Sequence, residues 1–171
     1  KLFKEYDDAI KLAQMILRRY DYNITNITPA EQEYCPIFWV DMSLLYEHYV
    51  LGLLKEAYGD KIHYQKKGHT GKPDFICYEP LMVMDTKYIP RLDRNGIDTY
   101  IARQLSGYSR DRKLFGDRPL SNIPCVILYP KEGAIENPFK NRPLEFLLEE
   151  EDASLWNFHR IPIPLPVLET L

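Results

Sequence analysis

The sequence has 171 residues, with 22 Lys and Arg against 25 Asp and Glu, a net charge of −3, and 45% hydrophobic residues. This length and composition predict a folded domain with a substantial core and exclude disordered or collagen-like chains. No apolar run approaches the ~20 residues that a membrane-spanning helix needs. The acidic balance argues against a basic surface that wraps nucleic acid, yet it is compatible with an acidic metal site acting on DNA through bridging cations.

The cysteines and the amino end bear on where the protein works. Cys35, Cys77 and Cys125 are odd in number and lack C-x-x-C spacing, which argues against a disulfide framework or a four-cysteine zinc site. Residues 1–6 contain no apolar signal core. We therefore expect a cytoplasmic protein. The absence of an initiator Met at position 1 predicts a fragment of a longer chain.

The amino-terminal part of the chain predicts two helices joined by a loop. Residues 3–20 carry apolar side chains at helical spacing, and residues 23–36 are polar and bounded by proline. Residues 41–58 are almost wholly apolar, with Asp41 as a candidate N-cap and Gly59 where a left-handed C-terminal residue belongs. This second segment predicts a helix buried on more than one side.

The rest of the chain alternates between strand and helix patterns, which is typical of an α/β sandwich with a mixed sheet. The predicted elements are a strand at 62–65, a loop at 66–71, strands at 73–78 and 81–88 around a turn at Glu79-Pro80, a helix at 95–114, and strands at 123–129 and 157–163. Pro130 is expected to end the strand before it, and prolines make the last strand an edge strand.

Two aspartates and a lysine form the most informative pattern. With the turn at residues 79–80, an antiparallel register in which paired residue numbers add up to 159 places Asp74 opposite Asp85. Directly opposed residues share a face of the sheet, with Cβ atoms ~4.5–5.5 Å apart. Lys87 lies two residues beyond Asp85 and shares that face. A register slip of one residue would put the carboxylates on opposite faces.

Opposed carboxylates destabilise a hairpin unless something lies between them. Mg²⁺ binds through one or two carboxylates plus substrate phosphate, polarises a scissile phosphate and activates water. Lys87 would orient that water or stabilise the developing charge. We therefore predict a metal site rather than mere surface charge. An ion pair of Asp85 with Lys87 explains the pattern less well, because residues i and i+2 need not touch.

Neighbouring segments supply further candidates. Glu47 has mostly apolar helical neighbours, where an unpaired carboxylate is costly. It either faces the metal pocket, as a ligand or through a water, or pairs at the rim with Lys55 or an arginine. Gln104 and Tyr108 share one helix face and would hold the nucleophilic water, contact phosphate or line the helix–sheet junction. Gln65 is a weaker candidate for the same roles.

Four basic residues lie on or near the predicted helix at 95–114: Arg103, Arg110, Arg112 and Lys113. They either contact the DNA backbone or form an ordinary solvated helix face.

Together these residues resemble the PD-(D/E)xK nuclease superfamily. Residues 38–50 look like the helix that opens the nuclease domain of McrC, the endonuclease subunit of McrBC-type modification-dependent restriction systems. The other matching segments follow in the family's order, at Gln65, 73–75, 85–88, 103–111 and 128–130. The resemblance covers roughly residues 3–130 and is carried by these ordered segments.

The resemblance implies a restriction-endonuclease-like α/β fold, with a central mixed sheet flanked by helices. It also implies Mg²⁺-dependent cleavage of DNA containing modified cytosine such as 5-methylcytosine, with Mn²⁺ able to substitute. The cleavage would be licensed by a hexameric AAA+ GTPase, McrB, and a dimer would cut both strands.

The same resemblance assigns roles to individual residues. It implies Asp74 and Asp85 as metal ligands, with the Thr86 carbonyl and Glu47 as further candidates. Lys87 would be the catalytic lysine, with Gln104 beside it. The candidates for DNA contact are Gln65, Tyr88, Arg103 and Tyr108.

The expected organisation is a single nuclease domain over residues 1–171. It comprises a helical lead-in and loop (1–36), a catalytic core (37–130) and a loop-rich carboxyl-terminal part (131–171). The amino-terminal region that engages the GTPase is expected to be missing. Two other functions stay open: a stand-alone exonuclease of the same fold, and a catalytically silent scaffold that binds DNA or a partner.

Overall fold

The computed structural model describes residues 40–89, 92, 96–118, 123–132 and 137–165. The chain divides after Val40, and residues 41–171 form a compact unit of their own. The helix predicted over residues 3–20 and the loop over 23–36 lie outside the described residues. Within the described ranges, no helix combines the length and apolar character needed to cross a bilayer.

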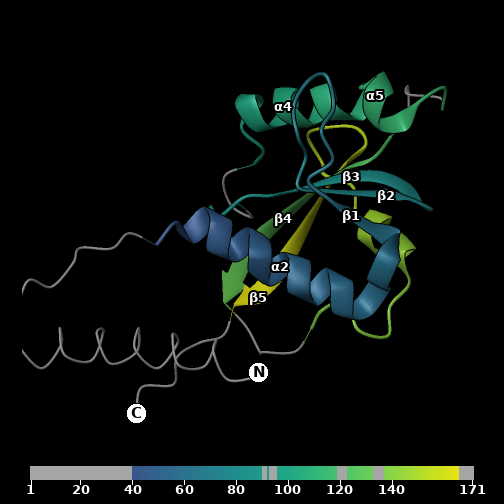
Figure 1. Cartoon of the computed structure of the whole chain (residues 1–171). Coiled ribbons are helices and arrows are strands. Elements are labelled where there is room, and N and C mark those ends of the chain that lie inside the picture. Colours follow the sequence, from purple (N-terminus) through teal and green to yellow (C-terminus); the bar gives the residue numbers. More distant parts are fainter. Residues whose placement is uncertain (1–39, 90–91, 93–95, 119–122, 133–136, 166–171) are drawn as a thin grey trace, which may run out of the picture. The chain divides into compact units, whose positions relative to one another are not determined.

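A five-stranded mixed sheet forms the centre of this unit (Figure 1). Its strands lie side by side in chain order: β1 (Ile62–Tyr64), β2 (Phe75–Tyr78), β3 (Leu81–Thr86), β4 (Cys125–Glu132) and β5 (Phe158–Leu165). The first three strands are antiparallel neighbours, whereas β3, β4 and β5 run parallel to one another. The predicted mixed sheet is confirmed, and β5 is the edge strand that its prolines indicated.

The hairpin of β2 and β3 has the predicted register. Phe75 pairs with Met84 and Ile76 pairs with Val83, so paired residue numbers add up to 159. A hydrogen bond from the Gln65 N–H to the Asp74 carbonyl (2.8 Å) continues the pairing of β1 with β2 by one residue. Continued by one residue, the hairpin register sets Asp74 opposite Asp85.

Helix α2 (Met42–Tyr58) has the predicted ends. The Asp41 carboxylate accepts hydrogen bonds from two first-turn N–H groups, and Gly59 follows the last residue with φ of 57°. The predicted burial on several sides is wrong. Within the described residues one stripe of α2 packs on the sheet, so its fully buried side chains are Tyr46, Val50 and Leu54, whereas Met42, Leu44 and Leu45 are exposed.

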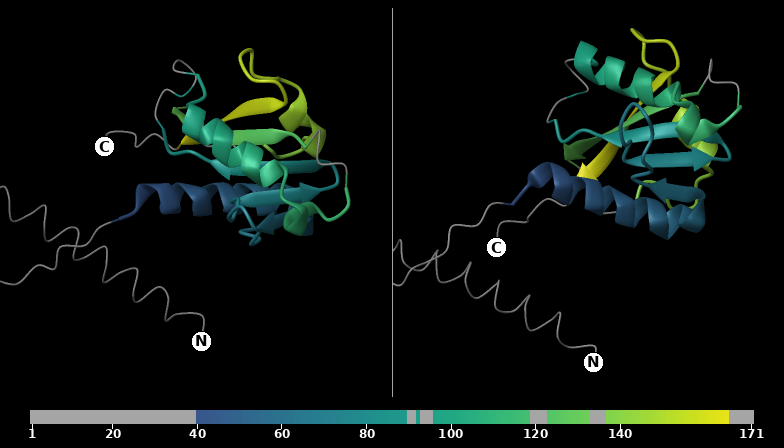
Figure 2. Two further views of the ribbon diagram at one scale, coloured as in Figure 1. Left: turned by 90° about the horizontal axis from the view of Figure 1, so that it is seen from above. Right: turned by 45° about the horizontal axis from the view of Figure 1, so that its top comes forward.

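Two helical layers cover the two faces of the sheet (Figure 2). Helix α2 and the 3₁₀ helix η3 (Leu144–Leu148) pack on one face, and α4 (Thr99–Ser109) and α5 (Arg112–Phe115) pack on the other. Alternation along β3 sends Met82 and Met84 into the core under α2, and Val83 into the core under α4. Asp85 is the next residue on the α4 face.

The helix predicted at 95–114 is interrupted. Gly96 has a positive φ of 68°, and α4 begins only at Thr99, where the Asp98 carboxylate caps the helix. The chain leaves α4 after Ser109, and Asp111 starts α5 by accepting a hydrogen bond from the Lys113 N–H (2.9 Å). Aspartate favours the N-cap over a helix interior, which explains the break.

The expected end of a strand at Pro130 is also wrong. Strand β4 continues to Glu132, and Pro130 pairs in register with Ile163 of β5. Pairing of β4 with β3 stops at Leu128. Beyond that residue one side of β4 has no strand beside it among the described residues, so a proline nitrogen without a hydrogen is tolerated.

Two leucines of α2 test this account of its packing. Leu54 is fully buried and Leu45 is 53% exposed. We expect Leu54→Ala to lower the free energy of unfolding by about 2–5 kcal/mol, because it leaves a cavity in the core. Leu45→Ala should change it by less than about 0.5 kcal/mol. Urea denaturation measures both, and equal losses would contradict the packing described.

Candidate functional site

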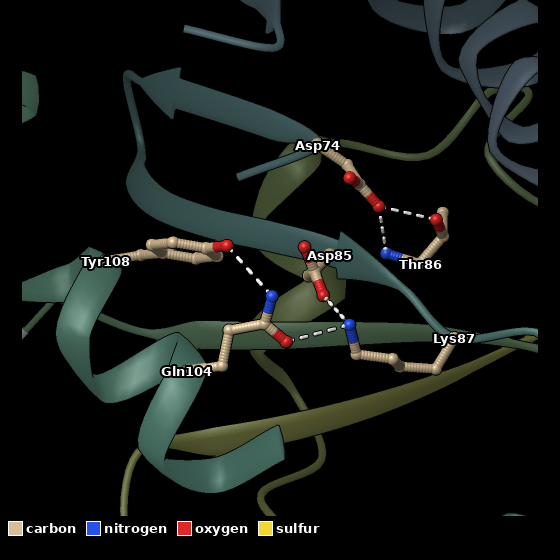
Figure 3. Close-up of polar contacts among 6 residues, drawn as sticks. All are labelled: Asp74, Asp85, Thr86, Lys87, Gln104 and Tyr108. Carbon is tan, nitrogen blue, oxygen red and sulfur yellow. Dashed lines mark hydrogen bonds and ion pairs between the residues drawn. The ribbon is translucent and has the colours of Figure 1, made fainter. Parts of the chain in front are cut away.

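The site lies at the open end of the β2–β3 hairpin, and Asp74 is held there by Thr86 (Figure 3). The N–H and the hydroxyl of Thr86 both donate to Oδ2 of Asp74, at 2.7 Å and 2.5 Å. Sequence reasoning considered Thr86 for its carbonyl and missed this clamp. The sequence signal for this contact was a threonine directly after Asp85, the aspartate that lies opposite Asp74. The clamp fixes the orientation of the Asp74 carboxylate at the edge of the sheet.

Asp85 is buried on the α4 face and forms an ion pair with Lys87. Asp85 is 2% exposed, and its Oδ2 has no hydrogen-bond partner among the described residues besides the Lys87 ammonium. The expectation that residues i and i+2 need not touch is therefore corrected: these two do. The Lys87 N–H continues the β3–β4 ladder to the Leu128 carbonyl (2.9 Å), so the backbone stays extended beyond β3. The side chains of Asp85 and Lys87 therefore lie on the same face of the sheet.

A chain of hydrogen bonds orients Lys87 from the helix above it. The Lys87 ammonium donates to Oε1 of Gln104 (3.0 Å), and Nε2 of Gln104 donates to the hydroxyl of Tyr108 (2.9 Å). Gln104 and Tyr108 lie one turn apart on α4, as the helical spacing predicted. Because both ends of the amide are engaged, Gln104 holds a fixed oxygen toward Lys87. The three side chains converge as Figure 3 shows.

The pKa values of both carboxylates are raised. Burial and the negative charge of Asp85 raise the pKa of Asp74 to about 7, against the opposing effect of the hydrogen bonds from Thr86. Burial also raises the pKa of Asp85, although Lys87 partly offsets this. The negative charge of Glu47 also raises the pKa of both aspartates. The site thus holds more negative charge than it can stabilise without a cation or protons.

Glu47 approaches the pair of aspartates from α2. It is half-buried and accepts a hydrogen bond from Nε2 of Gln65 (2.6 Å). Its alternative partner, Lys55, makes no ion pair with it. Gln65 has a positive φ of 47°, rare for a residue with a side chain. Tyr64 also hydrogen-bonds Glu47, and that contact adds to burial in raising the pKa of the phenol to about 12.

The donor set fits a hard divalent cation that keeps several waters. Among the described residues there is no cluster of three or more His, Cys, Asp or Glu side chains placed to hold a metal. Mg²⁺ needs only one or two carboxylates from the protein, with water and substrate phosphate as its other ligands. The crowded carboxylates of half-buried Asp74 and buried Asp85 meet that requirement, and Glu47 lies outside their immediate cluster.

Two predicted DNA contacts lie away from this cluster. Tyr88 packs on the α2 face, with its ring 5.7 Å from that of Tyr46. Arg103 is exposed on α4, and no hydrogen bond or ion pair joins its side chain to Lys87, Gln104 or Tyr108. Gln65 and Tyr108, by contrast, belong to the hydrogen-bonded groups around the aspartates and Lys87.

A five-stranded mixed sheet with helices on both faces is consistent with the restriction-endonuclease-like α/β fold. Comparison with protein families matches residues 1–108 to the McrBC 5-methylcytosine restriction system component family. This match spans more than half of the chain, so the chain belongs to that family. No curated protein and no solved structure matches it significantly.

Without divalent cations, we expect the free energy of unfolding to fall as the pH rises from 5 to 8. The pKa of Asp74 is raised from 3.8 to about 7. Between these two pH values Asp74 is therefore more protonated in the folded state than in the unfolded state. This contribution is complete below about pH 4 and is lost as the pH rises through about 7. Urea denaturation in EDTA measures it.

Matched asparagine variants identify the group responsible. Asp74→Asn should reduce the pH dependence to the part that Asp85 contributes, because burial raises the pKa of Asp85 as well. Asp60→Asn, at an exposed position after α2, should retain the full dependence. Asp111 and Asp152 have lowered pKa values and stay ionised over this range. A wild-type stability that is constant or rises between pH 5 and 8 would contradict the assignment.

Proposed function

We propose that this protein is a divalent-metal-dependent endodeoxyribonuclease, the cleavage subunit of a 5-methylcytosine-specific, GTPase-coupled restriction system. The proposal is supported chiefly by one observation: Asp74, Asp85 and Lys87 converge at one edge of the sheet. Membership of the McrBC component family supplies the biological setting.

Asp74 and Asp85 would hold the metal, with the Thr86 carbonyl and Glu47 as further candidate donors. Mg²⁺ is the expected ion and Mn²⁺ a substitute, because carboxylate and water oxygens suit both. When bound, such an ion polarises the scissile phosphate and lowers the pKa of a coordinated water. Thr86 keeps the Asp74 carboxylate in one orientation for this task.

Lys87 and Gln104 would act on the reacting phosphate. Lys87 is 20% exposed at its side chain, so its ammonium is accessible from solvent while still paired with Asp85. With a metal ion on Asp85, the ammonium would be free to donate hydrogen bonds to the attacking water or to the phosphate oxygens on which negative charge develops. Gln104, held by Tyr108, would keep the ammonium in position while its other partner changes from Asp85 to the reacting groups.

The remaining partners follow from the family. We propose DNA with modified cytosine as substrate, an AAA+ GTPase of the McrB type as partner, and a dimer for cutting both strands. The cell compartment would be the cytoplasm, in keeping with the free, buried thiols of Cys77 and Cys125. Gln65 and Tyr108 are the predicted DNA contacts that lie beside the catalytic residues.

The ion pair of Asp85 with Lys87 favours a second candidate function, a catalytically silent scaffold. The Lys87 ammonium balances the charge of one of the two carboxylates without any metal ion, so the fold does not require a metal. Metal binding separates the two functions, because the scaffold needs none.

Divalent cations should raise the melting temperature of the wild-type protein. A ligand that binds only the folded state stabilises it in proportion to RT ln(1 + [L]/Kd). We expect Mg²⁺ and Mn²⁺ at pH 8 to raise Tm, and Asp74→Ala and Asp85→Ala to abolish the increase. Asp60→Ala is the control and should keep it. An unchanged wild-type Tm in millimolar Mn²⁺ would favour the scaffold.

Cleavage of a methylated plasmid tests the catalytic residues. With the GTPase partner, GTP and Mg²⁺, we expect Lys87→Ala to lower the cleavage rate by at least about 100-fold, the scale of losing one charge-stabilising donor. Gln104→Ala should cause a smaller loss, because it positions Lys87 without replacing it. Lys61→Ala, an exposed lysine beyond α2, should cut at the wild-type rate. Equal cutting by Lys87→Ala and wild type would remove Lys87 from the mechanism.

A further inference from the structure

A buried carboxylate outside the metal site fastens the loop at residues 66–72 to the end of α4. Asp111 is 3% exposed, and its Oδ2 accepts hydrogen bonds from the His69 N–H (2.5 Å), the Thr70 N–H (2.7 Å) and the Thr70 hydroxyl (2.9 Å). Burial alone would raise the pKa of Asp111, but hydrogen bonds from Thr70, Lys113 and His69 outweigh it and lower the pKa. The loop is therefore held by an ionised group throughout the physiological pH range.

Two glycines make this attachment tight. A Cβ atom at Gly68 would lie 2.4 Å from Oδ2 of Asp111, and one at Gly71 would lie 2.8 Å from the Tyr108 ring. Gly71 also has a φ of 144°, which side chains rarely adopt. The loop is thus built to lie directly on α4, against the tyrosine that orients Gln104.

The fastened loop and the outer face of α4 border an open hollow of about 480 Å³. The residues that line it include Arg103, Arg110, Thr70, Ser106 and Gly107. The Thr70 hydroxyl also contacts the Gly107 carbonyl (3.2 Å), which joins the two walls. The volume is ample for a phosphate group and its sugar.

Among the residues that the structure describes, the two arginines in this hollow have no acidic partner. Both are exposed, and among the described residues neither forms an ion pair. The two aspartates that flank α4 are engaged elsewhere, since Asp111 holds the loop and Asp98 caps the helix. Guanidinium groups beside hydroxyls and a residue without a side chain are typical of phosphate recognition.

Exposed aromatic rings beside the arginines favour a nucleic acid over other polyanions. Trp156 is 72% exposed and lines an adjoining hollow together with Ser106 and Arg110. Tyr100 is 73% exposed and precedes Arg103 by three residues on α4, hence on the same helix face. Bases stack on such rings, whereas an acidic peptide has no need of them.

We propose that this hollow binds backbone phosphates of a DNA strand, with Arg103 and Arg110 as phosphate ligands and Trp156 against a neighbouring base or sugar. The proposal rests on the proposed function, since it assigns the same DNA a second point of attachment. Arg103 directly precedes Gln104 on α4, so the hollow and the side chain that contacts Lys87 are carried by the same helix. The hollow would contribute affinity for DNA, and the two aspartates and Lys87 would carry out the cleavage.

The test measures binding of a fluorescein-labelled DNA duplex and the matching single strand in EDTA, which prevents cleavage, over a range of KCl concentrations. Each phosphate contact contributes a slope of about −0.9 in log K against log salt for duplex DNA. We expect the double variant Arg103→Gln, Arg110→Gln to bind more weakly, with a slope smaller in magnitude by about 1–2. The double variant Lys55→Gln, Lys61→Gln removes the same charge at the end of α2 and should keep the wild-type slope.

The fluorescence of Trp156 provides a second readout. The chain has two tryptophans, so Trp39→Phe leaves Trp156 alone. We expect DNA to change its emission, and the two arginine substitutions to abolish this change. Competition by poly-glutamate with no change in emission would assign the hollow to an acidic protein and overturn the proposal.

Cleavage assays separate failure of this proposal from failure of the nuclease assignment. If the arginine variant matches the lysine variant in slope, or if wild type binds no DNA at any salt concentration, the hollow is not a DNA site, whether or not wild type cleaves. If the arginine variant binds as expected and wild type does not cleave in Mg²⁺, the nuclease assignment fails and the binding site stands. Where both hold, the arginine variant should show a higher KM with kcat unchanged.

Discussion

The pairing register of β2 with β3 is the constraint on which the site depends. With paired residue numbers adding up to 159, two carboxylates meet at the open end of the hairpin, one of them 2% exposed. Burial raises the pKa of both carboxylates, and the negative charge of Asp85 raises the pKa of Asp74 further. A hairpin that carries this unfavourable pair gains from a cation there, whereas a purely structural hairpin would be more stable with neutral residues.

Most of the fold was predictable because its signals are local. Asp41 and Gly59 marked the ends of α2, and the turn at Glu79-Pro80 fixed the register that brings Asp74 to Asp85. The failures came from tertiary context. Whether α2 has a neighbour on its second side, and whether Pro130 faces another strand, depends on what lies beside each element, which periodicity does not encode.

The same division applies to the site. The carboxylates, Lys87 and the facing pair of Gln104 and Tyr108 were predictable from spacing. The Thr86 clamp, the Asp85–Lys87 ion pair and the role of Asp111 depend on side-chain directions and on a loop folding back onto α4. The Asp111 attachment joins Gly71, Tyr108 and Gln104 into one packed series, so the loop and the site around Lys87 share a common support.

The most direct test of the central claim is anomalous diffraction from crystals of the protein soaked in Mn²⁺. The account predicts an anomalous peak within about 2.0–2.3 Å of carboxylate oxygens from both Asp74 and Asp85. It also predicts that the Lys87 ammonium moves away from Asp85 while keeping Gln104 as a partner. A map with no peak between the two aspartates, and with the ion pair to Lys87 intact at saturating Mn²⁺, would contradict it.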